Sequence, residues 1–241
     1  MRSGGTVMIR LEEYDLAQFS LTEGYVAVPF EVYQPVDGEL IVTVYPGLEK
    51  TADAFLRQFS ADPFSADAIA YVKEQLTPFV KEYDLAPSRD ADVHFLEYML
   101  QDRSDLCISR LLPDTEWIDG NTDMSKWSNA TTHALEMDPA DPDDACAVHR
   151  IGNTIAAYAA ENDFPEEMDV IEIHVECAPA YRRRGYATSC TVRLSQFLLD
   201  RGYSVKYVCR HTNAASARVA EKAGFSLTGR KYSFVCYRND G

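Results

Sequence analysis

Apolar residues recur with two different spacings along the first part of the chain, and the spacings predict strands and helices. Residues 26–33 and 39–45 are typical of two strands, and the Pro and Asp-Gly at residues 34–38 suit the turn between them. Ala and Leu at helical spacing predict a helix over residues 51–59. Residues 65–83 are predicted as a second helix, because their apolar positions fall on one stripe.

The middle of the chain is less regular. Residues 91–100 are predicted as a third helix, whereas residues 111–123 are interrupted by Pro113 and Gly120. Residues 138–144 are acidic and contain proline, which is typical of a solvated linker. No internal repeat is visible.

Beyond residue 145 the pattern predicts an ordered series of elements. A hairpin is expected over residues 145–160, with its turn at Gly152-Asn153. The elements expected after it are a strand at 170–177, a helix at 187–201 ended by Gly202, a strand at 205–210, a helix at 214–223 stopped by Gly224, and a closing strand at 232–238. This alternation implies an α/β sheet with parallel neighbours.

The net charge of −15 is unevenly distributed along the sequence. Residues 1–130 carry 23 acidic and 10 basic residues, and residues 131–176 carry 12 acidic residues and one basic residue. Residues 177–241 reverse the balance, with 3 acidic and 12 basic residues. The acidic body argues against general nucleic-acid binding. The basic end suggests a local site for a small polyanion.

Several classes of protein are disfavoured by the composition. No apolar run approaches the roughly 18 residues of a membrane span, and the N-terminus lacks the apolar core of a signal peptide, so a cytoplasmic protein is expected. The six cysteines form no Cys-x-x-Cys pair, and buried free thiols are expected. Cys146 and His149 are too few for a zinc site, so no metal is expected.

The most informative junction joins the strand at 170–177 to the helix that follows. Residues 182–188 read Arg-Arg-Arg-Gly-Tyr-Ala-Thr and open that helix. A helix N-terminus offers unpaired amides and partial positive charge, while Gly185 and Ala187 let an anion approach the backbone. This arrangement favours a pyrophosphate site, with a solvated basic loop as the alternative. The sequence lacks the Gly-x-Gly-x-x-Gly and Walker patterns of ordinary nucleotide-binding domains.

These residues resemble the GNAT superfamily of N-acetyltransferases. The family's phosphate loop, Gln/Arg-x-x-Gly-x-Gly/Ala, is matched by Arg182, Gly185 and Ala187. Its second signature, an Asn followed by Gly-Phe, is matched by Asn213 and, eleven residues later, by Gly224-Phe225. The resemblance covers approximately residues 145–241 and includes both signatures in the family's order.

The resemblance implies a domain organisation. Residues 107–241 are expected to form a GNAT-like catalytic domain that binds acetyl-CoA, with a mixed, splayed central sheet flanked by helices. Residues 1–106 are expected to form a divergent α+β part. The helices at 51–100 then replace the usual pair that shapes the acceptor site; a separate domain of unrelated purpose is the alternative.

The resemblance also assigns contacts to acetyl-CoA. In such enzymes the pantetheine arm pairs with the splayed strand, here at residues 175–177, and the amides of residues 183–187 hold the pyrophosphate. The residues assigned to the cofactor are Val175, Cys177, Arg182, Arg183, Arg184, Gly185, Tyr186, Ala187, Thr188, Asn213 and Ser216.

Catalysis in this family is the direct attack of an amine on the thioester, assisted by a base from the splayed strand. Glu172, His174 and Glu176 share one face of that strand. We favour Glu172, with His174 or Glu176 as substitutes, although loop length alone aligns the usual position with Ile171.

The family's usual tyrosine acid is replaced by Ala220. Its role then passes to Ser216, to Tyr232 or another tyrosine, or to water. A thiolate leaving group scarcely needs an acid.

The sequence therefore predicts an N-acetyltransferase that moves an acetyl group from acetyl-CoA to a primary amine of a small molecule or peptide. The acidic body suggests a cationic acceptor. Neither nucleic acid nor membrane is an expected partner, and a homodimer is compatible with the sequence. The alternative is a non-catalytic acyl-CoA-binding sensor or scaffold, which Ile171 and Ala220 favour.

Overall fold

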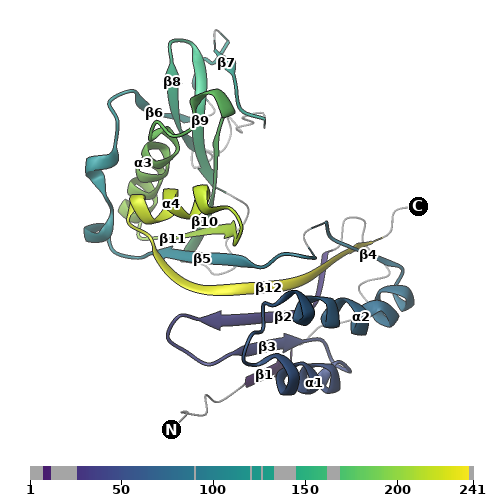
Figure 1. The fold of residues 1–241 in the computed structure, drawn as a ribbon. Coiled ribbons are helices and arrows are strands. Elements are labelled where there is room, and N and C mark those ends of the chain that lie inside the picture. The colour runs from purple at the N-terminus through teal and green to yellow at the C-terminus, as the bar shows by residue number, and fades with distance from the viewer. Residues whose placement is uncertain are drawn as a thin grey trace. The chain divides into compact units, whose positions relative to one another are not determined.

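The chain falls into two compact units, which are drawn in Figure 1. The computed structural model describes residues 8–11, 26–89, 91–119, 121–125, 127–132, 145–161 and 169–238. Unit 1 comprises Met1–Leu96 and Thr228–Gly241, and unit 2 comprises Glu97–Leu227. The sequence placed its division between residues 106 and 107. The compact units divide ten residues earlier, and the last strand returns to unit 1. The predicted linker at 138–144 lies outside the described residues.

Unit 1 combines a mixed sheet with two helices. Its elements are β1 (Met8–Leu11), β2 (Val26–Pro35), β3 (Ile41–Val44), α1 (Glu49–Phe59), α2 (Ala66–Glu82), β4 (Leu85–Pro87) and most of β12 (Ser226–Arg238). The strands lie in the order β1-β3-β2-β12, and β4 also pairs with β12. Only the β1–β3 pairing is parallel among the described pairs of this unit. The two predicted strands and the first two predicted helices are confirmed.

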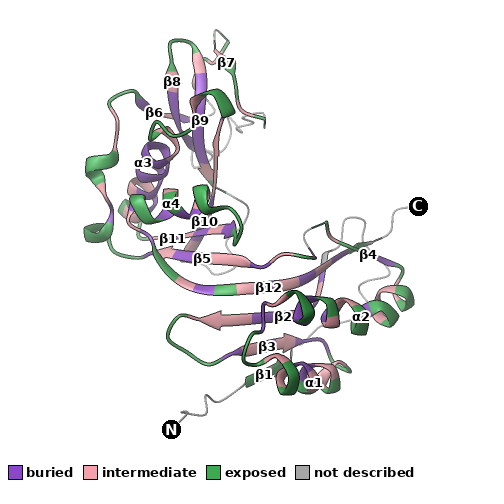
Figure 2. Ribbon diagram, in the orientation of Figure 1, coloured by how far each residue is buried: buried purple, intermediate pink, exposed green. Residues whose placement is uncertain are grey.

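Side chains alternate between the two faces of the strands in unit 1, and those on one face pack against the two helices. Val42 and Val44 on β3 share this face with Phe30 on β2. Phe55 of α1 meets Phe30 edge to face, with 5.4 Å between the ring centroids, and Leu76 of α2 belongs to the same buried cluster. Figure 2 shows the resulting pattern, in which the inner faces of these helices are buried and their outer faces are exposed.

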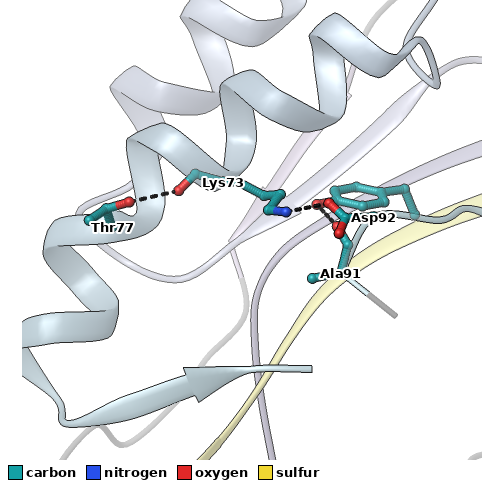
Figure 3. A network of polar contacts seen from close by, with 5 residues as sticks. Lys73, Thr77, Ala91 and Asp92 are labelled. Carbon is teal, nitrogen blue, oxygen red and sulfur yellow. Dashed lines mark hydrogen bonds and ion pairs between the residues drawn. The ribbon is translucent and has the colours of Figure 1, made fainter. Parts of the chain in front are cut away.

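A short network attaches the segment after β4 to α2 (Figure 3). Lys73 of α2 forms an ion pair with Asp92, and Thr77 donates from its hydroxyl to the carbonyl of Lys73 at 3.0 Å. Beside this pair, the Tyr232 hydroxyl donates to the carbonyl of Ala91 at 3.1 Å. Tyr232 is fully buried in the unit 1 core. Its hydroxyl proton is used in the hydrogen bond to the main-chain carbonyl of Ala91. The suggestion that Tyr232 protonates a leaving group is therefore wrong.

The strands of unit 2 pair in both orientations, and two helices pack against them. These strands are most of β5 (Phe95–Leu100), β6 (Thr115–Asp119), β7 (Ser128–Asn129), β8 (Ala145–Ile151), β9 (Thr154–Glu161), β10 (Val170–Cys177) and β11 (Ser204–Arg210). Its helices are α3 (Tyr186–Asp200) and α4 (Ala214–Ala223), with short 3-10 turns η2 (Arg103–Asp105), η3 (Ile108–Arg110) and η4 (Pro179–Tyr181).

The strands of unit 2 lie in the order β5-β11-β10-β9-β8-β6, and β7 pairs with β9. Helix α3 packs against β8, β9 and β10, while α4 packs against α3 and β11. The predicted hairpin, strands and helices beyond residue 145 are confirmed, and β12 begins six residues earlier than its predicted start at residue 232. The mixed α/β class that the sequence predicted is confirmed.

The prediction of a helix at 91–100 is wrong. Residues Phe95–Leu100 form β5, which lies beside β11 in the sheet. Leu, Glu and Met favour a helix in isolation, but pairing and packing in a sheet override such weak preferences. The burial of Tyr98 and Leu100 on β5 shows what the strand gains, since both side chains are at most 3% exposed.

Gly224 terminates α4 at a point of close backbone approach, which generates a stability prediction. Its φ is +110°, and an added Cβ would lie 2.0 Å from the carbonyl oxygen of Asp105. Gly224→Ala should therefore lower the free energy of unfolding of unit 2 by about 3 kcal/mol or more, from left-handed strain plus a backbone clash. Gly202→Ala is the matched control, because Gly202 has φ +89° and open space around its Cβ position. It should cost only about 1 kcal/mol.

Tryptophan fluorescence during urea unfolding measures the difference in unit 2. The chain has two tryptophans, Trp117 and Trp127, and both belong to unit 2. Equal losses of stability in Gly224→Ala and Gly202→Ala would contradict the close approach to Asp105.

Candidate functional site

The site begins where two parallel strands part. β10 pairs with β11 over three residue pairs, from Val170–Ser204 to Glu172–Lys206. From Ile173 to Cys177, β10 pairs with β9 alone among the described strands. On the side of β11, no described strand pairs with these five residues.

The loop after β10 turns the chain sharply into α3. The 3-10 turn η4 comes first, and the guanidinium of Arg182 donates from Nε to the carbonyl of Cys177 at 3.1 Å. Arg183 and Gly185 both have left-handed backbones, with φ of 64° and 88°. A Cβ at Gly185 would meet nothing within 4 Å, so this glycine serves the turn and leaves the space before the helix open.

The N-terminus of α3 is not capped by a side chain. Gly185 occupies the N-cap position, and the first helical hydrogen bond runs from the amide of Ser189 to the carbonyl of Gly185 at 2.9 Å. The amides of Tyr186, Ala187 and Thr188 precede that bond, and none has an acceptor among the described residues. Three free donors and the positive end of the helix dipole are the elementary components of an anion site.

A cleft of about 1160 Å³ extends over this helix end. Its lining residues come from the end of β10, the loop, the start of α3, β11 and α4: Val175, Glu176, Cys177, Pro179, Ala180, Arg182, Arg183, Arg184, Gly185, Tyr186, Ala187, Thr188, Tyr207, Asn213, Ala215, Ser216, Arg218, Val219 and Lys222. Every residue that the sequence assigned to the cofactor lies in this lining. Their assignment to a ligand stays a prediction.

Glu176 is the acidic residue of the lining, and hydrogen bonds hold its carboxylate. Thr132 donates to Oε1 from its amide and from its hydroxyl, both at 2.7 Å. The hydroxyl of Tyr158 lies 3.5 Å from Oε2. Burial, followed by the charge of Glu176, raises the pKa of Tyr158 to about 12, so this phenol stays protonated as a donor.

The other predicted strand residues lie outside the lining. Glu172 is 3.5 Å from the ammonium group of Lys206, which also lies 3.9 Å from Glu97. The ring of His174 lies 5.7 Å from that of Tyr158. Ile171 is 6% exposed, at the position to which loop length alone aligns the base. The structure thus brings Glu176, and neither Glu172 nor His174, to the cleft.

A hydroxyl pair on the far wall includes a residue that the sequence analysis missed. The hydroxyl oxygens of Tyr207 on β11 and Ser216 on α4 are 2.9 Å apart, and both residues line the cleft. Asn213 caps α4 by accepting from the amide of Ser216 at 3.1 Å. Burial raises the pKa of Tyr207 to about 12. The sequence held one signal for Tyr207: it lies two residues after Val205 in the predicted strand, and therefore on the same, buried face.

Ala220 faces the interior of unit 2 and is fully buried. This helix position therefore supplies no tyrosine, and the hydroxyl pair on the far wall of the cleft comes from Tyr207 and Ser216.

A buried polar chain supports the start of α3. Ser189 accepts from the amide of Leu112 at 2.8 Å and lies 2.6 Å from the hydroxyl of Thr115. That hydroxyl is also 2.9 Å from Nδ1 of His149. The His149 ring stacks on Tyr186 with 4.0 Å between centroids and 18° between planes. Stacking on His149 therefore holds Tyr186, and the hydrogen bonds of Ser189 to Leu112 and Thr115 hold the first turn of α3.

Other candidate features carry less weight. All six cysteines are free, and Cys146, Cys190, Cys209 and Cys236 are buried, as expected from the sequence. Within the described ranges, no three or more His, Cys, Asp or Glu side chains are grouped to hold a metal ion. The described helices include none long and apolar enough to cross a membrane.

The burial of His149 generates a pH prediction. Burial lowers the pKa of this imidazole, against an opposing effect of the Asp114 charge. Below the unfolded value of about 6.5, the unfolded chain binds a proton that the folded chain does not, so stability falls as pH drops toward the folded pKa. His149→Gln should remove this contribution, whose slope is at most about 1.4 kcal/mol per pH unit.

Urea unfolding followed by tryptophan fluorescence between about pH 7.5 and 5 checks this contribution. Identical slopes for wild type and His149→Gln would show that His149 is not held neutral.

A match to a protein family covers the segment that forms this cleft. The GNAT acetyltransferase family model matches residues 164–234, which include the whole loop and the Asn213 signature. None of the curated proteins compared with the chain matches it.

Among solved structures, the chain is similar to a GNAT-family protein from Novosphingobium aromaticivorans DSM 12444, with 20% identity over 65% of this chain and 68% of that chain and a TM-score of 0.49. It is also similar to a GCN5-related N-acetyltransferase-like protein from Streptococcus suis 89/1591, with 16% identity over 89% of this chain and 90% of that chain and a TM-score of 0.45. A protein from Salmonella typhimurium with its cofactor acetyl-CoA shares 18% identity over 38% of this chain and 65% of that chain, with a TM-score of 0.32.

These TM-scores are too low to inform the chemistry of the site. The likeness to the family rests instead on the sequence match at 164–234, together with the motifs that it contains. Residues 164–234 of the chain thus match the GNAT acetyltransferase family.

Proposed function

We propose that the protein is an N-acyltransferase that moves an acetyl group from acetyl-CoA to a primary amine of a small molecule or peptide. The observation that carries the proposal is the uncapped N-terminus of α3, which opens into a cleft lined by five basic residues. A diphosphate suits three free amides at the positive end of a helix. The family match supports acyl transfer in general.

The edge of β10 that faces β11 supplies the second part of the donor site. No described strand pairs with residues 173–177 on this side. The amide-bearing pantetheine arm can pair with this edge as an added strand does. Val175 and Cys177 line the cleft at this edge, next to the loop that would hold the diphosphate.

Glu176 is the residue that we propose to handle the amine. An ammonium group cannot attack a thioester, so a proton must leave the nitrogen before the new C–N bond forms. The Glu176 carboxylate lines the cleft and is fixed by Thr132, and it can accept this proton directly or through one water. Glu172 is less suitable, because Lys206 neutralises it outside the cleft lining.

The departing group is the thiolate of coenzyme A. After the amine nitrogen adds to the thioester carbonyl, the C–S bond breaks and the sulfur carries away the electron pair. The Ser216 hydroxyl, backed by Tyr207, can donate a hydrogen bond to this sulfur. Because a thiolate is a good leaving group, we expect loss of Ser216 to slow the reaction far less than loss of Glu176.

The acceptor is proposed to be cationic. The chain carries a net charge of −15, and an opposite charge on the acceptor raises the encounter rate. We retain the proposal that residues 1–106 contribute to acceptor binding. A cytoplasmic setting suits acetyl-CoA as the donor.

A non-catalytic acyl-CoA sensor is the second candidate, and two observations favour it. Ile171 stands at the aligned base position, and Ala220 replaces the usual tyrosine; both are buried. Incubation with acetyl-CoA and a panel of amines, with detection of free thiol, separates the two functions. Amine-dependent thiol release supports the enzyme, whereas acetyl-CoA binding without release on any amine supports the sensor.

Gly185→Glu tests the donor site. The variant places bulk and negative charge at the helix end, so it should abolish the thermal stabilisation by coenzyme A. For the wild type this stabilisation is about 2.7 kcal/mol at 100 times the Kd. Gly202→Glu is a matched control, because its φ of 89° is nearly the same as the 88° of Gly185. It should respond as the wild type does, and an unchanged response in Gly185→Glu would refute the loop assignment.

Glu176→Gln tests the proton acceptor against its nearest competitor. Steady-state kinetics should show a fall in kcat of about 10²–10⁴-fold, as expected for loss of a general base, with little change in Kd for coenzyme A. Glu172→Gln should stay close to the wild type. The reverse ranking of the two variants would return the role to Glu172.

A further inference from the structure

The cleft carries more positive charge than a diphosphate requires. Three of its basic residues stand on the loop before α3 and two on α4, namely Arg182, Arg183, Arg184, Arg218 and Lys222. Glu176 is the acidic residue of the lining, and Thr132 already engages its carboxylate. Within the lining, five basic side chains thus stand against one carboxylate.

These bases also lack carboxylate partners anywhere in the described part of the chain. Arg182 donates to the carbonyl of Cys177, and Arg184 lies 5.9 Å from the ring of Tyr181. Other basic residues of this acidic chain behave differently, since ion pairs with Asp or Glu are formed by Lys73, Arg103, Arg150, Lys206 and Lys231. Unpaired positive charge is thus concentrated where a polyanionic ligand would lie.

Arg218 and Lys222 form a basic group separate from the loop arginines. They are four residues apart on α4, so both project from one face of the helix, and both are exposed. Arg218 uses Nε to donate to the carbonyl of Ala214 at 3.2 Å. Its two terminal nitrogens remain for a ligand in the cleft.

We propose that Arg218 and Lys222 bind the 3′-phosphate of coenzyme A. This inference rests on the proposed function, because it assigns a second anionic group of the same donor. A phosphomonoester carries nearly two negative charges at neutral pH, twice the charge of each phosphate in the diphosphate. The planar guanidinium can engage two of its oxygens, while the ammonium adds a point charge.

Dephospho-coenzyme A tests the proposal, because it lacks only the 3′-phosphate. Calorimetry at fixed salt compares the Kd of coenzyme A and dephospho-coenzyme A for the wild type and for Arg218→Gln/Lys222→Gln. Gln keeps helix propensity at both positions. The control is Arg57→Gln/Arg230→Gln, which removes the same charge from exposed residues outside the cleft lining.

The wild type should bind dephospho-coenzyme A about tenfold or more weakly than coenzyme A, as expected for loss of charge-assisted hydrogen bonds. In Arg218→Gln/Lys222→Gln this ratio should fall toward one, through weaker binding of coenzyme A alone. Retained binding of dephospho-coenzyme A shows that the variant is folded. The control should keep the wild-type ratio.

Two results would overturn the proposal while leaving the donor site intact. One is a wild-type ratio near one, and the other is an equal loss of affinity for both ligands in Arg218→Gln/Lys222→Gln. Failure of the wild type to bind either ligand would remove the proposed function and this inference together.

Discussion

Main-chain groups that secondary structure leaves unpaired are the constraint on which the site depends. A folded chain satisfies nearly all of its buried amides and carbonyls, so free groups at one place call for a partner. Here the amides of Tyr186, Ala187 and Thr188 have no acceptor among the described residues, and no described strand pairs with residues 173–177 of β10 on the side of β11. Both sets of groups lie beside one cleft, and both are fixed by the fold rather than by flexible side chains.

The surroundings of the cleft keep these groups in position. Arg182 ties the loop to the end of β10, and His149 stacks beneath Tyr186. The chain Leu112–Ser189–Thr115 anchors the first turn of α3 to the segment before β6. An anion that enters such a site meets donors already in place, so little reorganisation opposes binding.

Charge is distributed to suit the same ligand. The acidic body lowers the attraction of the protein for anions in general, whereas the cleft presents bases that have no acidic partner among the described residues. Selectivity for a compact polyanion follows, because only a ligand that reaches the cleft gains this interaction. The same acidic body would favour the cationic acceptor that we propose.

Sequence reasoning identified residues that the structure gathers in one cleft, because their signals are local. The left-handed Gly185, the helix start at Tyr186 and the cap at Asn213 depend on residues next to one another. Parity placed Glu172 and Glu176 on one face of β10, but it did not show that Lys206 pairs with Glu172 or that Thr132 holds Glu176. Those contacts join residues 34 and 44 positions apart.

Residues 95–100 illustrate the second limit of sequence reasoning. Their composition suits a helix, and only the position of β11 beside them makes them a strand. Tyr207 was missed for a related reason, since its role depends on Ser216 approaching from α4. In each case a tertiary neighbour decides between two locally acceptable outcomes.

Amide NMR of the α3 N-terminus tests the central claim most directly. On addition of coenzyme A, the amides of Tyr186, Ala187 and Thr188 should shift downfield and exchange more slowly with solvent, as free donors that acquire phosphate acceptors. Coenzyme A that binds while leaving these three amides unchanged would contradict the account.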